Sequence, residues 1–538
     1  MGPRLCLGEE NRMKAFLLLV LVLTAVPAGW ADPPWLANVQ VSDNPGGYNQ
    51  NEVSIVLWRN NVYAGFNDYR VPSVKAFFAR STNGGTSFLP NVQMATDSTA
   101  SVMGDPALAV DDLGNLYYVL CDFTKYRVYV CRSTNNGASF LPTQHVSYGR
   151  PSIDKSWISC RGQNVYVTWD EAAGVSHDWF NKSTDRGVTW GTPVQVDHAT
   201  WGSSRWGPVP KEALDGTIYV SWGCDTRSGI DTVNGIYCAR STNGGASFLN
   251  EVLVQPTRFR YDSSNPRVFQ LPPLETSPLL ASHLFMVFED SRGNTSADRY
   301  NLNVYATRST DGGQTWTARV KVNDDSTTAN DTTQQFMPWL AVDYRGWLHA
   351  AWYDGRRFGG GSNRYDIFYA YSSNGGLTWS RNERVTDTSF VASSFYGDYI
   401  GIAADSNYVF AAWCDGRNSS TAPDIYLSRR ALPSGVEELA EGRALPPELE
   451  LAQNAPNPLR ERTSISFALP RNGPVDLAVY DITGQGIRTL LKGERQAGFG
   501  AVQWDGKNEK GLPVPPGVYL YRLKAGTEVR TKKMVLTR

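Results

Sequence analysis

The sequence has little charge, few histidines and few sulfur-containing residues. Asp, Glu, Lys and Arg make up 19% of its 538 residues, the formal net charge is −1, and there are five His, seven Cys and seven Met. A nucleic-acid partner would require a clustered basic excess, which this balance does not supply. Scattered His, no Cys pair at metal-ligand spacing and no compact Asp-rich loop indicate that neither a metal nor another cofactor is required.

Long hydrophobic segments are also missing, with one exception near the N-terminus. Met13 and a lysine precede an apolar run over residues 15–25, and small residues precede a cleavage point after Ala31. This arrangement predicts a signal peptide over residues 1–31 that starts at Met13, with a buried N-terminal helix as the alternative. The run is too short for a membrane span. We therefore expect an exported mature protein, secreted or at the cell surface, with no transmembrane segment.

Export permits disulfide bonds, but the pairing of the cysteines stays open. Two pairs fall on the two arms of predicted hairpins, Cys121 with Cys131 and Cys224 with Cys238. Cross-strand disulfides need a specific Cα separation and side-chain direction, so buried thiols are the alternative. The six cysteines beyond the signal peptide are Cys121, Cys131, Cys160, Cys224, Cys238 and Cys414.

Glycine and aromatic residues are abundant, with 49 Gly and 12% Phe, Trp and Tyr. A short motif that contains both recurs, and its fullest copy is Ser309-Thr310-Asp311-Gly312-Gly313-Gln314-Thr315-Trp316. Further copies begin at Ser81, Ser133, Ser183, Ser241 and Ser372. A motif that recurs at roughly 50 to 70 residues indicates a repeat architecture of the size of propeller blades.

The motif has the chemistry of a turn. Its Asp or Asn can accept hydrogen bonds from backbone N–H groups two residues on, and its Gly adopts positive φ without a Cβ clash. The Trp or Phe that ends it is a large apolar anchor. β-rich runs flank the fullest copy at residues 303–308 and 318–322. The motif therefore joins two antiparallel strands.

These residues resemble the Asp box, or BNR repeat, of the sialidase superfamily. The resemblance implies an all-β protein with a β-propeller over residues 32–430. It implies less about activity, because Asp boxes also occur in binding proteins and in other hydrolases, and a fold alone does not fix a function.

A unit of four strands recurs around the motif. Its second strand ends in an acidic residue, near Asp68, Asp122, Asp170, Asp225, Asp290, Asp354 and Asp415. These are seven units for six motifs, and the last unit stops after residues 424–428 without a motif or a fourth strand. The isolated strand at residues 38–42 supplies the missing strand and so removes two open sheet edges. We predict a seven-bladed β-propeller; a six-bladed one, with one unit as an insertion, is the alternative.

A second, smaller domain follows the propeller. Residues 431–450 are acidic and contain Pro, which predicts a linker. Residues 451–538 contain alternating strands separated by Gly or Pro, which predict a small Ig-like β-sandwich. The strands are expected at 464–469, 475–480, 500–504 and 517–523.

This C-terminal region resembles the sorting domain of the type IX (Por) secretion system, which is close to the FlgD-like Ig fold. The matching segments are 454–458, 479–484, 504–506, 517–523 and 532–536. The resemblance implies that the secretion machinery is the partner of this domain. A generic Ig-like spacer or a carbohydrate-binding module is the alternative.

Antiparallel strands place the repeated turns on one rim of a propeller and the ends of the second strands on the other. We expect a ligand on this second rim, at the mouth of the central channel. The pattern there is either a charged ring or one salt bridge repeated within each blade, and repetition favours the salt bridge because a catalytic site is asymmetric. It comprises Asp68/Arg70, Asp225/Arg227, Asp290/Arg292, Asp354/Arg356 and Asp415/Arg417.

The candidate site residues lie on the same rim, where they open the first strands or follow the second ones. Those that open the first strands are expected nearest the channel, with Lys155, Glu289 and Tyr399 beside them. The candidates for a catalytic role are Asp105, Asp154, Glu171, Arg205, Arg267, Arg356, Tyr396, Asp398 and Arg417.

The sialidase resemblance implies three Arg that hold a substrate carboxylate, a Tyr nucleophile with a Glu, and an Asp as acid and base. Sialidases carry an Arg-Ile-Pro motif at the start of the first blade. The nearest string here, Tyr69-Arg70-Val71-Pro72, falls between the second and third strands. No catalytic position is therefore assigned by motif.

Two functions remain. The first is a secreted or cell-surface propeller that binds a glycan or glycoprotein without catalysis. The second is a divergent exo-sialidase or other glycoside hydrolase with an Arg cluster and a Tyr–Glu pair. The absent Arg-Ile-Pro context favours the first or a divergent enzyme, and the sequence specifies neither the sugar nor the linkage.

Overall fold

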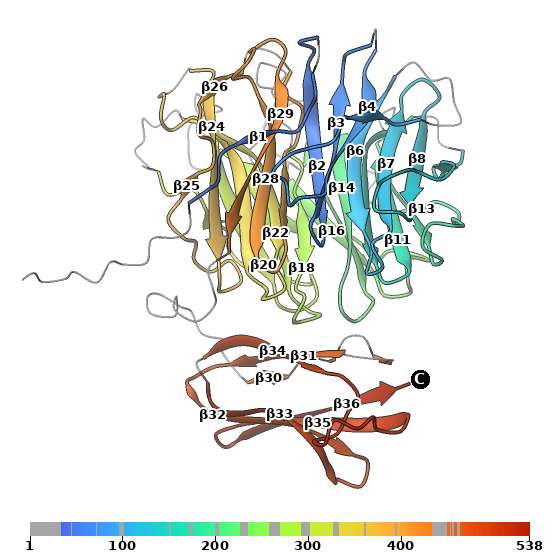
Figure 1. Ribbon diagram of the computed structural model, residues 1–538, viewed down its shortest axis with the longest axis vertical. Coiled ribbons are helices and arrows are strands. Elements are labelled where there is room, and N and C mark those ends of the chain that lie inside the picture. The colour runs from blue at the N-terminus through green and yellow to red at the C-terminus, as the bar shows by residue number, and fades with distance from the viewer. Residues whose placement is uncertain are drawn as a thin grey trace, which may run out of the picture.

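The computed structural model is all-β (Figure 1). Among the described residues there are 36 strands and no helix. The predicted signal peptide, most of the predicted linker and Arg267 lie outside them. The described residues are 34–44, 46–71, 73–95, 102–149, 152–171, 176–198, 204–225, 235–257, 270–291, 302–325, 333–359, 362–392, 395–432, 449–451, 453–454, 457–459, 463–495 and 497–537.

Seven antiparallel sheets make up the first part of the chain, and we call them blades 1 to 7. Blade 1 contains β2 (Gln50–Trp58), β3 (Asn61–Asp68), β4 (Lys75–Ser81) and β5 (Val92–Gln93). Blade 2 contains β6 (Met103–Val110), β7 (Leu116–Asp122), β8 (Arg127–Ser133) and β9 (Gln144–His145). Blade 3 contains β10 (Asp154–Arg161), β11 (Asn164–Asp170), β12 (Asp178–Ser183) and β13 (Val194–Gln195). Blade 4 contains β14 (Ser204–Glu212), β15 (Ile218–Asp225), β16 (Gly235–Ser241) and β17 (Val252–Pro256).

The remaining blades follow the same order. Blade 5 contains β18 (Leu274–Thr276), β19 (Leu284–Asp290), β20 (Asn303–Ser309) and β21 (Val320–Lys321). Blade 6 contains β22 (Gln335–Val342), β23 (Leu348–Asp354), β24 (Arg364–Ser372), β25 (Glu383–Arg384) and the added β26 (Phe390–Val391). Blade 7 contains β27 (Gly401–Ala404), β28 (Tyr408–Asp415), β29 (Asp424–Ala431) and β1 (Val39–Gln40).

The N-terminal strand closes the ring, as predicted. β1 pairs antiparallel with β29, with Val39 opposite Leu427, so the first strand of the chain is the outer strand of the last blade (Figure 1). The first strands of neighbouring blades contact one another, which places them around the centre. The all-β class, with a propeller followed by an Ig-like domain, is confirmed.

The second strand of each blade forms much of the core. β7, β19 and β23 are buried along their whole length, which explains why they combine aromatic and small residues instead of alternating with polar ones. In blades 6 and 7 a fully buried Trp lies two positions before the terminal Asp. Trp352 donates its indole N–H to Asp354 at 2.8 Å, and Trp413 donates to Asp415 at 2.7 Å. The acidic strand end thus satisfies the one polar group of the core Trp.

The repeated turn has the chemistry that its sequence predicts. The Ser309 hydroxyl accepts the N–H of Gly313 at 2.8 Å and donates to Asp311 at 2.8 Å. Asp311 in turn accepts the N–H and the hydroxyl of Thr315, at 2.9 and 2.6 Å. The bond from the Gly N–H to the Ser hydroxyl recurs in the five other copies. Each copy lies between the third and fourth strands of its blade.

A basic residue near the end of the third strand ties most blades to the next one. It donates to a backbone carbonyl of the following blade's turn, through Arg80, Arg132, Lys182, Arg240, Arg308 and Arg429. In blade 6 the equivalent residue is Tyr371, which stacks on Trp347 with ring centroids 5.6 Å apart. Blade 7, which follows it, has no repeated turn. The basic residue is therefore absent from blade 6, whose neighbour, blade 7, also lacks the turn carbonyl that would accept its hydrogen bond.

The C-terminal domain contains two sheets around its own core. One sheet has the order β30 (Glu450–Leu451), β31 (Thr463–Leu469), β34 (Gly498–Trp504). The other has the order β33 (Gly486–Arg495), β32 (Gly473–Asp481), β35 (Gly517–Ala525), β36 (Glu528–Leu536). Trp504, Leu477, Tyr521 and Met534 are buried between them. This is a sandwich of the expected kind.

The six cysteines beyond the signal peptide are free thiols, and five of them are buried. The strand register explains why the hairpin pairs do not form disulfides. Cys121 lies opposite Val128, and Cys131 lies opposite Tyr118. In blade 4, Cys224 lies opposite Gly235 instead of Cys238. The alternative of buried thiols is the one that the structure shows.

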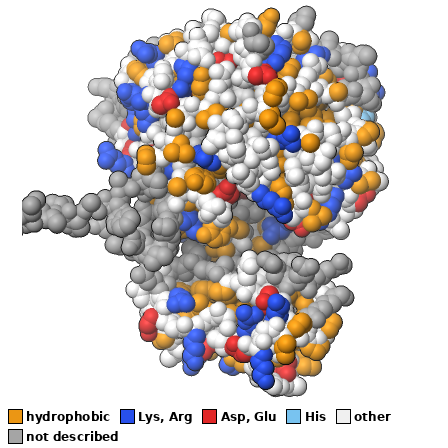
Figure 2. All heavy atoms as spheres, in the orientation of Figure 1, with side chains coloured by type: hydrophobic (Ala, Val, Ile, Leu, Met, Phe, Trp, Pro, Cys, Tyr) orange, Lys and Arg blue, Asp and Glu red, His pale blue; other side chains and the backbone are white. Residues whose placement is uncertain are grey.

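The charges on the surface are mixed. On the face seen in Figure 2, Lys and Arg side chains alternate with Asp, Glu and apolar ones, without a continuous basic area. This distribution agrees with the formal net charge of −1.

Candidate functional site

The first strands of five blades contain the same irregularity close to the rim that carries the second-strand ends. A bulge interrupts the pairing of β2, β6, β10, β14 and β22 with their neighbours. The residue at the bulge has positive φ in each case: Glu52, Asp105, Lys155, Gly207 and Met337. This conformation costs free energy for a residue with a Cβ and is concentrated at functional sites.

The charged members of this set meet around one lysine. The ammonium nitrogen of Lys155 lies 2.7 Å from Asp398, 2.9 Å from Asp105, 3.3 Å from Glu52 and 4.0 Å from Asp154. We call these five residues the axial cluster. They come from blades 1, 2 and 3 and from the segment that leads into blade 7, so they gather at one side of the ring.

Most side chains of the axial cluster are shielded from solvent. The side chains of Lys155, Glu52 and Asp398 are at most 4% exposed, whereas that of Asp154 is 26% exposed. Asp154 is therefore the member that solvent or a ligand reaches first. Asn67 supports the buried part, because its amide donates to Glu52 at 2.8 Å and its carbonyl accepts the N–H of Asp105 at 3.0 Å.

The proton affinities within the cluster diverge. Burial raises the pKa of Glu52 well above its ordinary value, and the negative charge of Asp105 adds to the shift. Burial also raises the pKa of Asp154, to about 7, and Asp105 again contributes. Burial works against ionisation of Asp105 too, but the charge of Lys155 and hydrogen bonds from Glu52 and Asp154 lower its pKa. The pKa of Asp105 is therefore shifted in the direction opposite to the pKa values of its neighbours Glu52 and Asp154.

Aromatic side chains lie deeper along the axis. The rings of Trp157 and Trp339 are 4.7 Å apart, and Tyr399 packs against Trp157 with its centroid at 4.9 Å. These residues belong to blades 3 and 6 and to the entry of blade 7, so they meet across the centre. The Tyr399 hydroxyl donates to the carbonyl of Pro106, next to Asp105. The axial cluster therefore lies on an aromatic floor.

Two further carboxyl groups of blade 3 are buried near Asp154, which lies opposite Asp170. Asp170 and Asp178 lie opposite each other on β11 and β12 and are fully buried. None of their four carboxyl oxygens has a hydrogen-bond partner among the described residues. Burial raises the pKa of both well above the ordinary value, and nearby carboxylates add to the shift. In the described part of the chain, no group of three or more His, Cys, Asp or Glu has the arrangement of a metal site.

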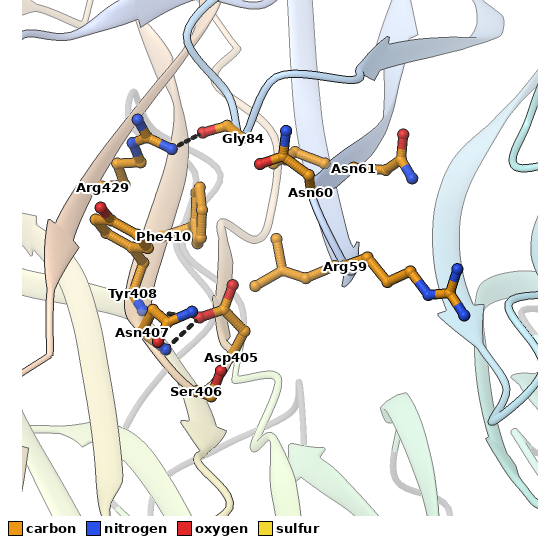
Figure 3. Close-up of a pocket in the computed structure, with 12 residues that line it drawn as sticks. Arg59, Asn60, Asn61, Gly84, Asp405, Ser406, Asn407, Tyr408, Phe410 and Arg429 are labelled. Carbon is orange, nitrogen blue, oxygen red and sulfur yellow. Dashed lines mark hydrogen bonds between the residues drawn. The ribbon is translucent and has the colours of Figure 1, made fainter.

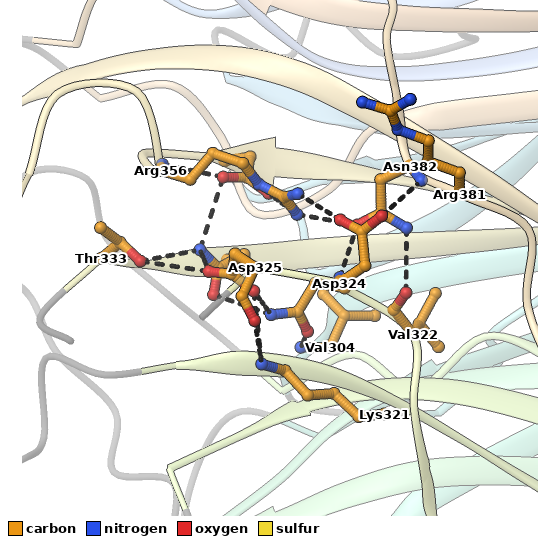
Figure 4. A network of polar contacts seen from close by, with 12 residues as sticks. Val304, Lys321, Val322, Asp324, Asp325, Thr333, Arg356, Arg381 and Asn382 are labelled. Carbon is orange, nitrogen blue, oxygen red and sulfur yellow. Dashed lines mark hydrogen bonds and ion pairs between the residues drawn. The ribbon is translucent and has the colours of Figure 1, made fainter. Parts of the chain in front are cut away.

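Arg356 belongs to a link between two blades (Figure 4). It donates to Asp354 of its own blade at 2.9 Å and to Asp324, which follows β21 of blade 5, at 2.6 Å. Its third contact is the side chain of Asn382 at 2.8 Å. Asp324 and Asn382 also exchange bonds between side chain and backbone, at 2.8 and 2.9 Å. Each of the three guanidinium nitrogens of Arg356 thus donates to an acceptor within the fold.

The same link occurs twice more. Arg70 contacts Asp68 of its own blade and Asp43 of blade 7. Arg417 contacts Asp415 of its own blade and Asp387 of blade 6. In these three pairs the acid–Arg pattern is therefore structural, as repetition favoured, whereas Arg227 and Arg292 lie outside the described residues. The expectation of a bridge confined to one blade needs correction for the three. Each Arg also bonds the preceding blade, because the chain passes from one blade to the next beside it.

The other candidate residues lie apart from Lys155 in the contacts that the structure gives. Arg205 is 2% exposed and pairs with Asp197 at 3.3 Å. The Tyr396 hydroxyl donates to the carbonyl of Val391 at 2.6 Å, and burial raises its pKa. Glu171 accepts the indole N–H of Trp179 at 3.1 Å. The structure thus joins Asp105, Asp154 and Asp398 but not the Arg and Tyr of the sialidase expectation.

Two members of the site, Glu52 and Asn67, were missed by sequence reasoning. A signal for Glu52 exists: it stands directly before the apolar part of its first strand, as Asp105 and Lys155 do in theirs. Aligning the blades on their first strands would have revealed it. Asn67 has no such signal, because it is one of several polar residues at second-strand ends.

A comparison with protein families finds a match in the C-terminal domain. The family model of the FlgD Ig-like domain matches residues 459–528. No curated protein matches the chain. None of the described residues belongs to a helix that is long and apolar enough to cross a bilayer.

Several solved structures are similar to a large part of the chain. An alpha-L-arabinanase of Penicillium chrysogenum shares 13% identity over 75% of this chain and 100% of its own, with a TM-score of 0.42. An alpha-L-arabinofuranosidase of Fusarium graminearum shares 14% identity over 74% of this chain and 99% of its own, with a TM-score of 0.41. A Hadza microbial sialidase shares 16% identity over 74% of this chain and 69% of its own, with a TM-score of 0.41. These similarities concern the fold alone.

Proposed function

We propose that the protein is a secreted carbohydrate-active propeller that cleaves a neutral glycan at the axial cluster by acid–base chemistry. The observation that carries the proposal is Asp154, an accessible carboxyl group whose pKa is raised to about 7 beside the buried carboxylate of Asp105. Two carboxyl groups with diverging pKa values are what glycoside hydrolysis requires.

Each residue has a role in this proposal. Asp154 donates a proton to the leaving oxygen, because it is protonated near neutral pH and reachable from solvent. Asp105 stays ionised, because Lys155 lies 2.9 Å away. It stabilises the positive charge that develops on the sugar as water attacks the anomeric carbon and releases its proton to solvent.

A neutral substrate fits the charges better than a sialoside. Lys155 is one cation among four carboxyl groups, and Arg70, Arg356 and Arg417 are engaged in links between blades. A sialidase would need three Arg to hold the substrate carboxylate. The cation of the axial cluster, Lys155, is already paired with carboxyl groups, so it is not available to hold the carboxylate of an anionic sugar.

The test is hydrolysis of a panel of neutral aryl glycosides, with a fluorogenic sialoside as the anionic member. We expect turnover of at least one neutral substrate and loss of at least about a hundredfold in kcat in Asp154→Asn, in the range that removal of a general acid produces. Asp112→Asn, which changes an exposed carboxylate between blades 2 and 3, is the control and keeps full activity. Turnover of the sialoside alone, or a fully active Asp154→Asn variant, contradicts the proposal.

A non-catalytic glycan-binding propeller is the second candidate. The burial of Glu52, Lys155 and Asp398 favours it, because a dry ion cluster also serves to join blades. A folded protein that binds glycans on an array but turns over none of the panel would establish this alternative.

Secretion belongs to the same proposal. It is supported by the sequence of residues 1–31 and by the resemblance of the C-terminal region to type IX sorting domains. Fusing residues 449–538 to an exported reporter in a bacterium with this system tests it. We expect the reporter at the cell surface or in the medium, and retention when residues 532–538 are deleted; equal export of both fusions contradicts a sorting role.

A further inference from the structure

A cavity lies on the rim that carries the repeated turns, away from the axial cluster. It has a volume of about 400 Å³ and is formed between blade 7 and blade 1 (Figure 3). The turn at Asp405–Tyr408 supplies one wall, and the turn at Arg59–Asn61 with Gly84 supplies the other. Binding sites for small molecules start at about 300 Å³, so the cavity has room for a sugar or a short glycan.

Another interface of the repeat shows how a side chain can fill this place. The N–H of Gly84 donates to the carbonyl of Asn60 at 2.8 Å, as the N–H of Arg186 donates to Gln163 in blade 3 at 2.9 Å. Both residues have positive φ, 67° for Gly84 and 60° for Arg186. Gly84 and Arg186 therefore occupy the same position of the repeated turn.

Between blades 2 and 3 this position is filled by a side chain. The Arg186 guanidinium contacts Asp111 at 2.5 Å, Asp112 at 2.8 Å and the carbonyl of Gly162 at 3.0 Å. Between blades 7 and 1 the equivalent residues are Asp405, Ser406 and Arg59. Asp405 and the Arg59 carbonyl can still accept hydrogen bonds at this interface. Gly84, however, has no side chain that donates one.

The charges at the two interfaces decide what the cavity accepts. Between blades 2 and 3, two Asp balance Arg186 and Arg132. Between blades 7 and 1, Ser406 replaces an Asp and Gly84 replaces the Arg, which leaves Asp405 balanced by Arg429. The Arg59 guanidinium lies over Trp58, with its carbon 5.4 Å from the ring centroid, and points away from the cavity (Figure 3). A neutral ligand therefore fits better than a cation or an anion.

The residues that line the cavity have side chains that form hydrogen bonds with hydroxyl groups of a ligand. Asp405 accepts the N–H groups of Asn407 and Tyr408 through Oδ1, and no described residue is recorded as a partner of its Oδ2. Asn407 presents an exposed side-chain amide, and the Tyr408 ring forms part of the wall. We propose that this cavity is a secondary binding site for a neutral, polyhydroxylated ligand, namely a neutral glycan.

Gly84→Arg is the variant that tests the proposal, because it restores the side chain that Arg186 supplies elsewhere. A Cβ at Gly84 meets the flexible guanidinium of Arg429, which can move. Gly244→Arg is the matched control: it introduces the same residue at the same turn position of blade 4, where a Cβ meets only the end of Lys182 at 3.5 Å. Binding of arabinobiose, lactose and cellobiose to the full chain is measured by titration calorimetry and ligand-observed NMR.

In the wild type and in Gly244→Arg we expect binding of at least one disaccharide. In Gly84→Arg we expect one site fewer, or an affinity at least about tenfold lower. The Asp154→Asn variant keeps this site, so failure of the catalytic proposal and failure of this one are separate results. Identical stoichiometry and affinity in Gly84→Arg and the wild type, or no binding of any disaccharide to the wild type, overturns the inference. Stronger binding of glucosamine or glucuronate than of neutral sugars also overturns it.

Discussion

The ammonium group of Lys155 lies 2.7 Å from the carboxylate of Asp398, and this contact joins blade 3 to the start of blade 7. The neighbour of Asp398 makes the approach possible. Gly397 has a φ of 87°, and a Cβ there would lie 2.7 Å from the backbone nitrogen of Glu52. Only glycine lets the two segments come this close. The axial cluster thus depends on backbone geometry in blades 1 and 7 as well as on its charges.

Replacing Lys155 with Met tests the electrostatic role of the lysine. The variant removes the only cation from the axial cluster, and we expect it to unfold more easily by about 3–5 kcal/mol near neutral pH, as for broken buried ion pairs. The loss shrinks at acidic pH, because the carboxyl groups then take up protons. Denaturant unfolding followed by tryptophan fluorescence measures it. The control is Lys211→Met, which breaks the partly exposed pair with Glu275 and should lower the free energy of unfolding less. Equal losses in the two variants would contradict the electrostatic role of Lys155.

The raised pKa of Asp154 predicts a pH dependence of stability. An Asp in an unfolded chain titrates at about 3.9, whereas burial raises the pKa of Asp154 in the fold to about 7. Between these values the native state holds a proton that the unfolded state has released, so this group lowers stability as pH rises through the window. Asp154→Asn lacks the contribution. Thermal unfolding midpoints of the two proteins should diverge in favour of the variant as pH increases, and parallel profiles would disprove the assignment.

Arg356→Ala separates a structural role from a catalytic one. It leaves Asp354, which is fully buried, without its guanidinium, and we expect a loss of about 3 kcal/mol in stability. Turnover or glycan binding per folded molecule remains unchanged, because the guanidinium is engaged between blades 5 and 6. The control is Arg364→Ala, an exposed Arg in the same blade, which changes neither property. A large rise in KM without loss of stability would instead return Arg356 to the site.

The sequence predicts the repeating parts of this molecule far better than its site. The turn at Ser309–Trp316 and the pairing of β1 with the last blade follow from local patterns that recur along the chain. Asp105, Asp154 and Asp398 were placed near the centre because they open first strands. Their convergence on Lys155 depends on bulges at Glu52, Asp105 and Lys155, which no local pattern reveals. The outward bonds of Arg70, Arg356 and Arg417 to the preceding blade also depend on contacts between distant segments.

The copies of the repeated turn differ at one position, where some carry Asp and others carry Asn, and this difference leads to a prediction. Asp311 and its equivalent Asp185 accept hydroxyl groups from Thr, whereas four other copies carry Asn that donates its amide to Ser or Thr, as Asn374 does to Thr378 at 2.7 Å. Asp311→Asn should therefore change stability little. Asp311→Ala removes the acceptor for the N–H of Thr315 and should cost about 1–2 kcal/mol, as for lost caps. Equal thermal midpoints of the two variants would contradict this role of the side chain.

The free cysteines predict a protein that is insensitive to reductant. Burial raises the pKa of Cys131 and of Cys238 to about 12, so their reactive thiolate is scarce in the native state. We expect iodoacetamide to leave the buried thiols unmodified under native conditions and to label them all in denaturant, with no increase on prior reduction. Intact-protein mass spectrometry measures the number of labels. Burial also raises the pKa of the half-buried Cys160, so it should stay unlabelled under native conditions like the five buried thiols. Labelling that requires prior reduction would show that a disulfide forms after all, and the register of Cys121 opposite Val128 argues against that result.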